Sequence, residues 1–134
     1  MKPVLRNKDK GNALIRYYKS FLHAIDGIVY AFKNEHNMII ILIAAILAVL
    51  AGFGFNISQG EWFFVIIVIG LIAATEMINT AIEATIDLIT TKIHPLAKIA
   101  KDTASSASLI LSITAFIGAL IIFLPKLIQI INSL

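Results

Sequence analysis

The sequence contains no cysteine and very little charge. Of its 134 residues, 14% are charged and 59% are hydrophobic. The absence of cysteine excludes disulfides and thiolate metal sites. Scarce charge argues against a water-soluble domain, because such domains carry about 25% charged residues. The composition therefore indicates a small integral membrane protein.

Motifs of soluble nucleotide-binding enzymes are also missing. There is no phosphate-binding loop of the form GxxxxGK(S/T) and no soluble-kinase signature. The net charge of +3 does not indicate a nucleic-acid partner, since basic residues beside apolar runs more often contact anionic lipid headgroups. We therefore expect a membrane partner and no nucleic acid.

Three apolar runs are long enough to cross a bilayer as helices. The predicted spans are residues 38–55, 62–88 and 104–124. Ser58 and Glu61 precede the second run with the spacing of a capping box, which predicts a helix start. We expect the third span to stop at Pro125, because proline cannot donate a backbone hydrogen bond.

Basic residues are distributed unequally around these spans. Seven precede the first span, none lies between the first and second, and three lie between the second and third (Lys2, Arg6, Lys8, Lys10, Arg16, Lys19 and Lys33; then Lys92, Lys98 and Lys101). The positive-inside rule places the N-terminus and the 88–103 connection in the cytoplasm. The C-terminus is then expected outside a cell membrane.

An amphipathic helix is expected ahead of the first span, over about residues 12–33. Apolar side chains recur there at helical spacing (Leu14, Tyr18, Phe21, Ile25, Ile28, Val29 and Phe32). Such a helix suits the cytoplasmic membrane surface. The alternative is a helix packed on a partner protein.

A polar stripe marks the cytoplasmic end of the second span, in the segment "EMINTAIEATID". On a helix its members share one face because they are three, four or seven residues apart (Glu76, Asn79, Thr80, Glu83 and Asp87). A charge in hydrocarbon costs at least about 2.5 kcal/mol, so this face must meet water, cations or protein. The alternatives are contacts that only join helices and, for Asp87, a solvated extension of the helix.

Three further charged residues are expected at the same depth. Glu35 precedes the first span, and Lys101 with Asp102 precedes the third. Oxygen ligands suit a hard ion such as Mg²⁺, and a lysine suits phosphate oxygens. Lys101 could also be an interfacial lysine, and His94 fits a turn before Pro95 better than a metal site. The residues alone indicate an oxygen-rich cation site and leave open a cation-conducting protein or an accessory subunit.

Two segments resemble signatures of the prokaryotic diacylglycerol kinase family. "EMINTAIEATID" matches the pattern E-x-x-N-S/T-A-I-E-x-x-x-D, and "HPLAKIAKDTASSAS" matches a histidine, a short spacer and A-K-D before small residues. The resemblance covers essentially the whole chain and is strongest to the undecaprenol kinase branch. It implies an all-α homotrimer with active sites shared between subunits. It also implies Mg-ATP as phosphate donor and a lipid alcohol, undecaprenol or alternatively diacylglycerol, as acceptor.

Roles for individual residues follow from the same resemblance. It implies that Glu76 is the general base and that Asn79 helps to hold the reacting groups. It further implies that Glu35 and Glu83 bind the metal.

The resemblance also implies a set of nucleotide contacts. Lys101 is similar to the family's phosphate-binding lysine, whereas Asp87 and Asp102 resemble residues near the nucleoside. Arg16 matches an arginine on the surface helix that reaches the nucleotide. One stretch departs from the family: residues 105–108 read Ser-Ser-Ala-Ser where many relatives carry alanine and glycine.

Overall fold

The computed structural model of the protein describes residues 13–133. Within this range the chain forms four helices and no strand: α1 (Ala13–Asn34), α2 (His36–Gly54), α3 (Gln59–Ile89) and α4 (Pro95–Asn132). The predicted helix start at residue 12 and four of the basic residues lie outside the described range (Lys2, Arg6, Lys8 and Lys10). The prediction of an all-α chain is thus confirmed over the described residues.

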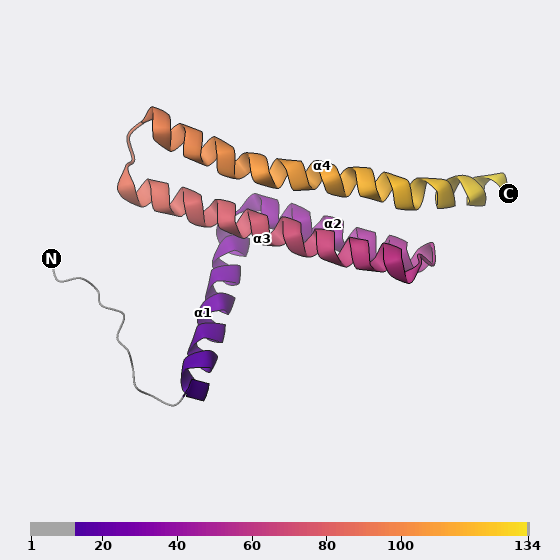
Figure 1. Cartoon of the computed structure of the whole chain (residues 1–134), viewed down its shortest axis with the longest axis horizontal. Coiled ribbons are helices and arrows are strands. Elements are labelled where there is room, and N and C mark those ends of the chain that lie inside the picture. The colour runs from indigo at the N-terminus through magenta and orange to yellow at the C-terminus, as the bar shows by residue number, and fades with distance from the viewer. Residues whose placement is uncertain (1–12, 134) are drawn as a thin grey trace.

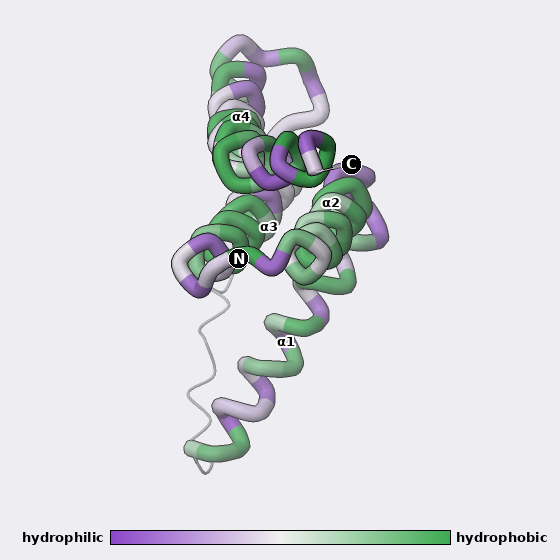
Figure 2. The backbone as a smooth tube through the Cα atoms, turned by 90° about the vertical axis from the view of Figure 1, so that its right-hand side faces the viewer, coloured by the Kyte–Doolittle hydropathy of each residue, from purple (hydrophilic) through white to green (hydrophobic). Residues whose placement is uncertain are grey.

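Three of the helices lie alongside one another. Figure 1 shows α2, α3 and α4 running along one axis, with α1 projecting steeply from the start of α2. Helix α3 packs against both α2 and α4. All three are long and apolar enough to cross a membrane, as predicted, and Figure 2 shows their mainly hydrophobic colouring.

Local sequence signals fix the start of α3. The Ser58 side chain accepts a hydrogen bond from the Glu61 backbone N–H, and the Ser58 N–H donates to Glu61 Oε2 at 2.6 Å. This confirms the predicted capping box. Glu61 Oε1 also lies 3.2 Å from Lys126 Nζ, so the same carboxylate ties the α2–α3 turn to α4.

A small apolar cluster closes this end of the bundle. Ile57, Val65 and Ile122 are buried together. Gly118 allows close packing beside them, because a Cβ at this position would lie 2.3 Å from the Phe64 ring. The helices approach closely where one of them carries no side chain.

Helix α4 does not stop at Pro125 as the sequence predicted. It continues through the proline to Asn132. Proline removes one backbone donor but has a φ angle that a helix accepts. Ending the helix in an apolar environment would leave several backbone groups unpaired, which costs more than one missing hydrogen bond. The apolar residues beyond Pro125 therefore extend the helix.

Candidate active site

Glu76 is the best-buried large side chain among the described residues. It is 2% exposed and lies on α3 beside the first turn of α2. Its Oε1 accepts a hydrogen bond from Asn37 Nδ2 at 2.8 Å, and its backbone carbonyl accepts one from Thr80 Oγ1 at 3.0 Å. A buried carboxylate is costly without such partners. The structure therefore fixes one acidic group at a defined position.

Sequence reasoning did not identify Asn37. This residue lies on α2, 39 positions before Glu76, and donates directly to the buried carboxylate. The feature of the sequence that could have pointed to Asn37 is that an asparagine stands in the first turn of an otherwise apolar span. Helical spacing rules compare residues on the same helix. They therefore could not show that Asn37 would meet a side chain on a different helix.

Asn79 continues the polar face of α3. It is 5% exposed, and its Nδ2 donates to Glu83 Oε1 at 3.2 Å. Its Oδ1 is buried without a hydrogen-bond partner. Asn79 therefore orients one of the two predicted metal ligands and keeps an unused acceptor inside the protein.

Glu35 brings a third carboxylate to this region from a separate segment. It is the half-buried residue preceding α2. Burial first, and then the negative charges of Glu83 and Glu76, raise the pKa of Glu35 above its ordinary value. Repulsion among carboxylates is relieved by a cation, so the electrostatics of this region favour a positively charged ligand.

The donor set fits magnesium of a nucleotide better than an all-protein metal cage. Among residues 13–133, no three histidine or acidic side chains are arranged to hold a metal ion. Magnesium commonly takes only one or two protein carboxylates and completes its shell with water and substrate phosphates. Glu35 and Glu83 are the two carboxylates that the sequence analysis assigned to this role.

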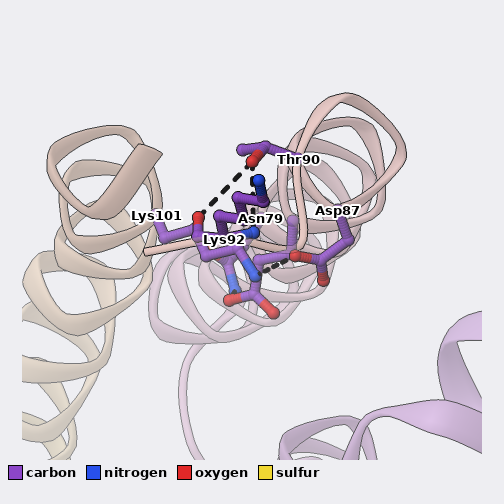
Figure 3. Close-up of polar contacts among 6 residues, drawn as sticks. Asn79, Asp87, Thr90, Lys92 and Lys101 are labelled. Carbon is purple, nitrogen blue, oxygen red and sulfur yellow. Dashed lines mark hydrogen bonds and ion pairs between the residues drawn. The ribbon is translucent and has the colours of Figure 1, made fainter. Parts of the chain in front are cut away.

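Helix α4 contributes a positively charged side chain to the site. Lys101 Nζ lies 2.6 Å from Asp87 Oδ1 on α3, and Figure 3 shows this ion pair joining the two helices. The Glu83 carboxylate also acts electrostatically on Lys101. The structure thus unites the predicted phosphate-binding lysine with two predicted acidic site residues.

A second ion pair lies beside the first. Lys98 pairs with Asp102 one helical turn away on α4. Both pairs border an open cavity of about 320 Å³ at the α3–α4 connection. His94 caps α4 by accepting a hydrogen bond from the Leu96 N–H at 3.2 Å, which confirms that it is a turn residue.

Arg16 is the one predicted site residue that lies far from the others. It is exposed near the start of α1. At roughly 1.5 Å per residue it stands about 27 Å from the end of that helix at Asn34. Figure 1 shows this part of α1 pointing away from the bundle. Within a single chain Arg16 does not join the carboxylate cluster.

The fold and the site define a small helical membrane protein with one buried carboxylate, two half-buried ones and a lysine paired with an aspartate. The model of the family described as prokaryotic diacylglycerol kinase matches residues 22–123. The chain belongs to this family. It is a lipid kinase, and as a kinase it uses ATP.

Individual relatives are similar over most of their length. The undecaprenol kinase of Bacillus subtilis (strain 168) is 44% identical over 121 residues, which cover 90% of this chain and 98% of that protein. A diacylglycerol kinase of Helicobacter pylori is 36% identical over 101 residues, 75% of this chain and 79% of the relative. A diacylglycerol kinase of Pseudomonas aeruginosa is 32% identical over 88 residues, 66% and 72% respectively.

Proposed function

We propose that the protein phosphorylates undecaprenol to undecaprenyl phosphate, with Mg-ATP as donor and Glu76 as general base. The observation that carries the mechanism is the buried Glu76 carboxylate, held by Asn37 beside Glu83 and Glu35. The similarity to an undecaprenol kinase over 98% of that protein supports the choice of acceptor. Diacylglycerol is the alternative acceptor, supported by the names of other relatives.

In the proposed reaction Glu76 removes the proton from the lipid hydroxyl. The hydroxyl oxygen forms a bond to the γ-phosphorus of ATP, the bond from that phosphorus to the β,γ-bridging oxygen breaks, and ADP leaves with the electron pair. Asn37 fixes the direction in which the Glu76 carboxylate points. Asn79 holds Glu83 and, as proposed, helps to hold the reacting groups.

Glu35 and Glu83 would hold Mg²⁺, which neutralises charge on the triphosphate when bound. Lys101 binds phosphate oxygens in exchange for part of its contact with Asp87. Asp87 and Asp102 lie at the 320 Å³ cavity, which is open to solvent and offers the nucleoside a place beside them. Phosphoryl transfer depends chiefly on positioning and charge neutralisation, and this set of groups supplies both.

An apolar cavity supports a lipid acceptor. It has a volume of about 370 Å³, lies between α2 and α4 over α3, and is lined almost entirely by aliphatic and aromatic side chains. Ile72, one helical turn from Glu76, belongs to its lining. A hydrocarbon chain lying in this cavity would place its terminal hydroxyl near the proposed base.

The proposed topology places α1 on the cytoplasmic surface of the cell membrane and the C-terminus outside. The steep angle between α1 and the three spans supports this, because a helix perpendicular to the spans lies along the membrane plane (Figure 1). Several large apolar side chains on α1 are exposed and available to lipid (Leu14, Tyr17, Tyr18 and Phe21).

We further propose a homotrimer with shared active sites. Arg16 lies too far along α1 to reach the site of its own chain, so its proposed nucleotide contact would be made in a neighbouring subunit. Crosslinking of the purified protein in lipid measures the subunit number directly. A monomer with full activity would exclude this arrangement.

The acceptor is tested with purified protein in lipid micelles, given Mg-ATP and either undecaprenol or diacylglycerol. Undecaprenyl phosphate is the expected main product at equal acceptor concentrations. A clear preference for diacylglycerol would overturn the acceptor assignment and leave the kinase chemistry intact. Absence of lipid phosphorylation with both acceptors would overturn the proposed function.

A further inference from the structure

Two side-chain atoms in the described part of the chain are buried without a hydrogen-bond partner. They are Asn79 Oδ1 on α3 and Ser108 Oγ on α4. Buried polar atoms are almost always paired in proteins, because an unpaired one has lost water without replacement. Each of these two atoms therefore requires a hydrogen-bond partner. The Ser108 hydroxyl can donate a hydrogen bond, and the Asn79 amide oxygen can accept one.

The register of the two helices brings both residues to the same depth. Helices α3 and α4 run in opposite directions, and the Asp87–Lys101 ion pair joins them near the connecting loop (Figures 1 and 3). Asn79 lies about 12 Å along α3 from Asp87, and Ser108 lies about 10.5 Å along α4 from Lys101, at roughly 1.5 Å per residue. The two residues thus lie at about the same depth along the paired helices.

The Ser108 hydroxyl is not used by its own helix. Ser106, Ser112 and Thr114 on α4 each donate to the carbonyl four residues earlier. This is the usual way in which a hydroxyl is satisfied within a helix. Ser108 makes no such bond, although its oxygen is buried. Its proton is therefore available to a group on α3.

We propose that one ordered water links the two atoms, accepting from Ser108 Oγ and donating to Asn79 Oδ1, and that Ser108 thereby positions Glu83. A donor on Oδ1 fixes the orientation of the Asn79 amide and directs Nδ2 to Glu83 Oε1, where the structure places it at 3.2 Å. Ser108 is then a positioning residue that acts through Asn79. The inference rests on the proposed function only in treating Glu83 as a magnesium ligand.

The contact itself is tested without any activity measurement. Protein labelled with ¹⁵N-asparagine gives a side-chain amide resonance for Asn79, which is assigned by its loss in Asn79→Asp. We expect this resonance to shift in Ser108→Ala and to stay near its original position in Ser108→Thr, which keeps the hydroxyl. Thr114→Ala, which removes an exposed hydroxyl from the same helix, is the matched control and leaves it unchanged. An unchanged Asn79 resonance in Ser108→Ala would overturn the proposal.

The effect on metal binding is tested by titrating Mg²⁺ in the kinase assay and Mn²⁺ by electron paramagnetic resonance. Loss of one buried hydrogen bond corresponds to a factor of about five, so Ser108→Ala should raise the half-saturating metal concentration by about that factor. Ser108→Thr should restore it. In a Glu83→Gln background, Ser108→Ala should add nothing, because its effect passes through Glu83.

The outcomes separate this inference from the proposed function. A shifted Asn79 resonance with unchanged metal affinity in Ser108→Ala would refute the positioning role, provided that Glu83→Gln weakens metal binding. If Glu83→Gln left metal binding unchanged, the metal assignment in the proposed function would fail. In that case a shifted resonance would still support the water-mediated link between Ser108 and Asn79.

Discussion

Replacing Asn37 by leucine removes the donor that holds Glu76 and nearly preserves side-chain volume. The bond from Asn37 Nδ2 to Glu76 Oε1 is 2.8 Å long, and its acceptor is charged whenever Glu76 acts as a base. Hydrogen bonds to charged groups contribute about 1.5–3 kcal/mol. Without this bond the Glu76 carboxylate is no longer held in the orientation proposed for proton transfer. Taking the bond energy as the cost of restoring that orientation, and about 1.4 kcal/mol as a factor of ten in rate, Asn37→Leu should lower kcat about 10- to 150-fold.

Transfer of radiolabelled phosphate from ATP to undecaprenol in micelles measures this loss. Asn34→Leu is the matched control, because Asn34 Nδ2 also donates over 2.8 Å, but to the carbonyl of Tyr30 within α1. The control should retain turnover within a factor of two. Equal turnover in Asn37→Leu and Asn34→Leu, with both proteins folded by circular dichroism, would refute the role assigned to Asn37.

Three further predictions concern the base, the metal region and helix packing. Glu76→Gln should abolish turnover while sparing ATP binding, measured by equilibrium dialysis; near-normal turnover would remove the proposed base. The pKa of Glu35 is raised above its ordinary 4.5, so this carboxyl takes up a proton at a higher pH than a free glutamate does. Lowering the pH through that raised pKa should therefore weaken Mg²⁺ binding. The same protonation should stabilise the metal-free fold, because the folded state favours the neutral acid, and Glu35→Gln should flatten both pH dependences. Gly118→Ala forces a Cβ to within 2.3 Å of Phe64 and should cost about 1–3 kcal/mol in thermal or denaturant unfolding, whereas Gly70→Ala meets open space and should not.

Features that depend only on neighbouring positions were predictable from the sequence. The three spans followed from the length of the apolar runs, and the start of α3 followed from the spacing of Ser58 and Glu61. The polar stripe of α3 was predictable because helical periodicity alone places Glu76, Asn79 and Glu83 on one face. In each case one segment and the helix repeat contain all the information.

Tertiary structure decided which segments meet. It brought Asn37 to Glu76 across 39 residues of sequence and Lys101 to Asp87 across the α3–α4 connection. It also left the start of α1, which carries Arg16, pointing away from the three spans. The sequence determined the polarity of each helix and which residues share a face, because these are local properties. It did not determine where α4 ends, since this helix continues through Pro125. The partners across helices depended on register and crossing angle, which only the packing of complete helices sets.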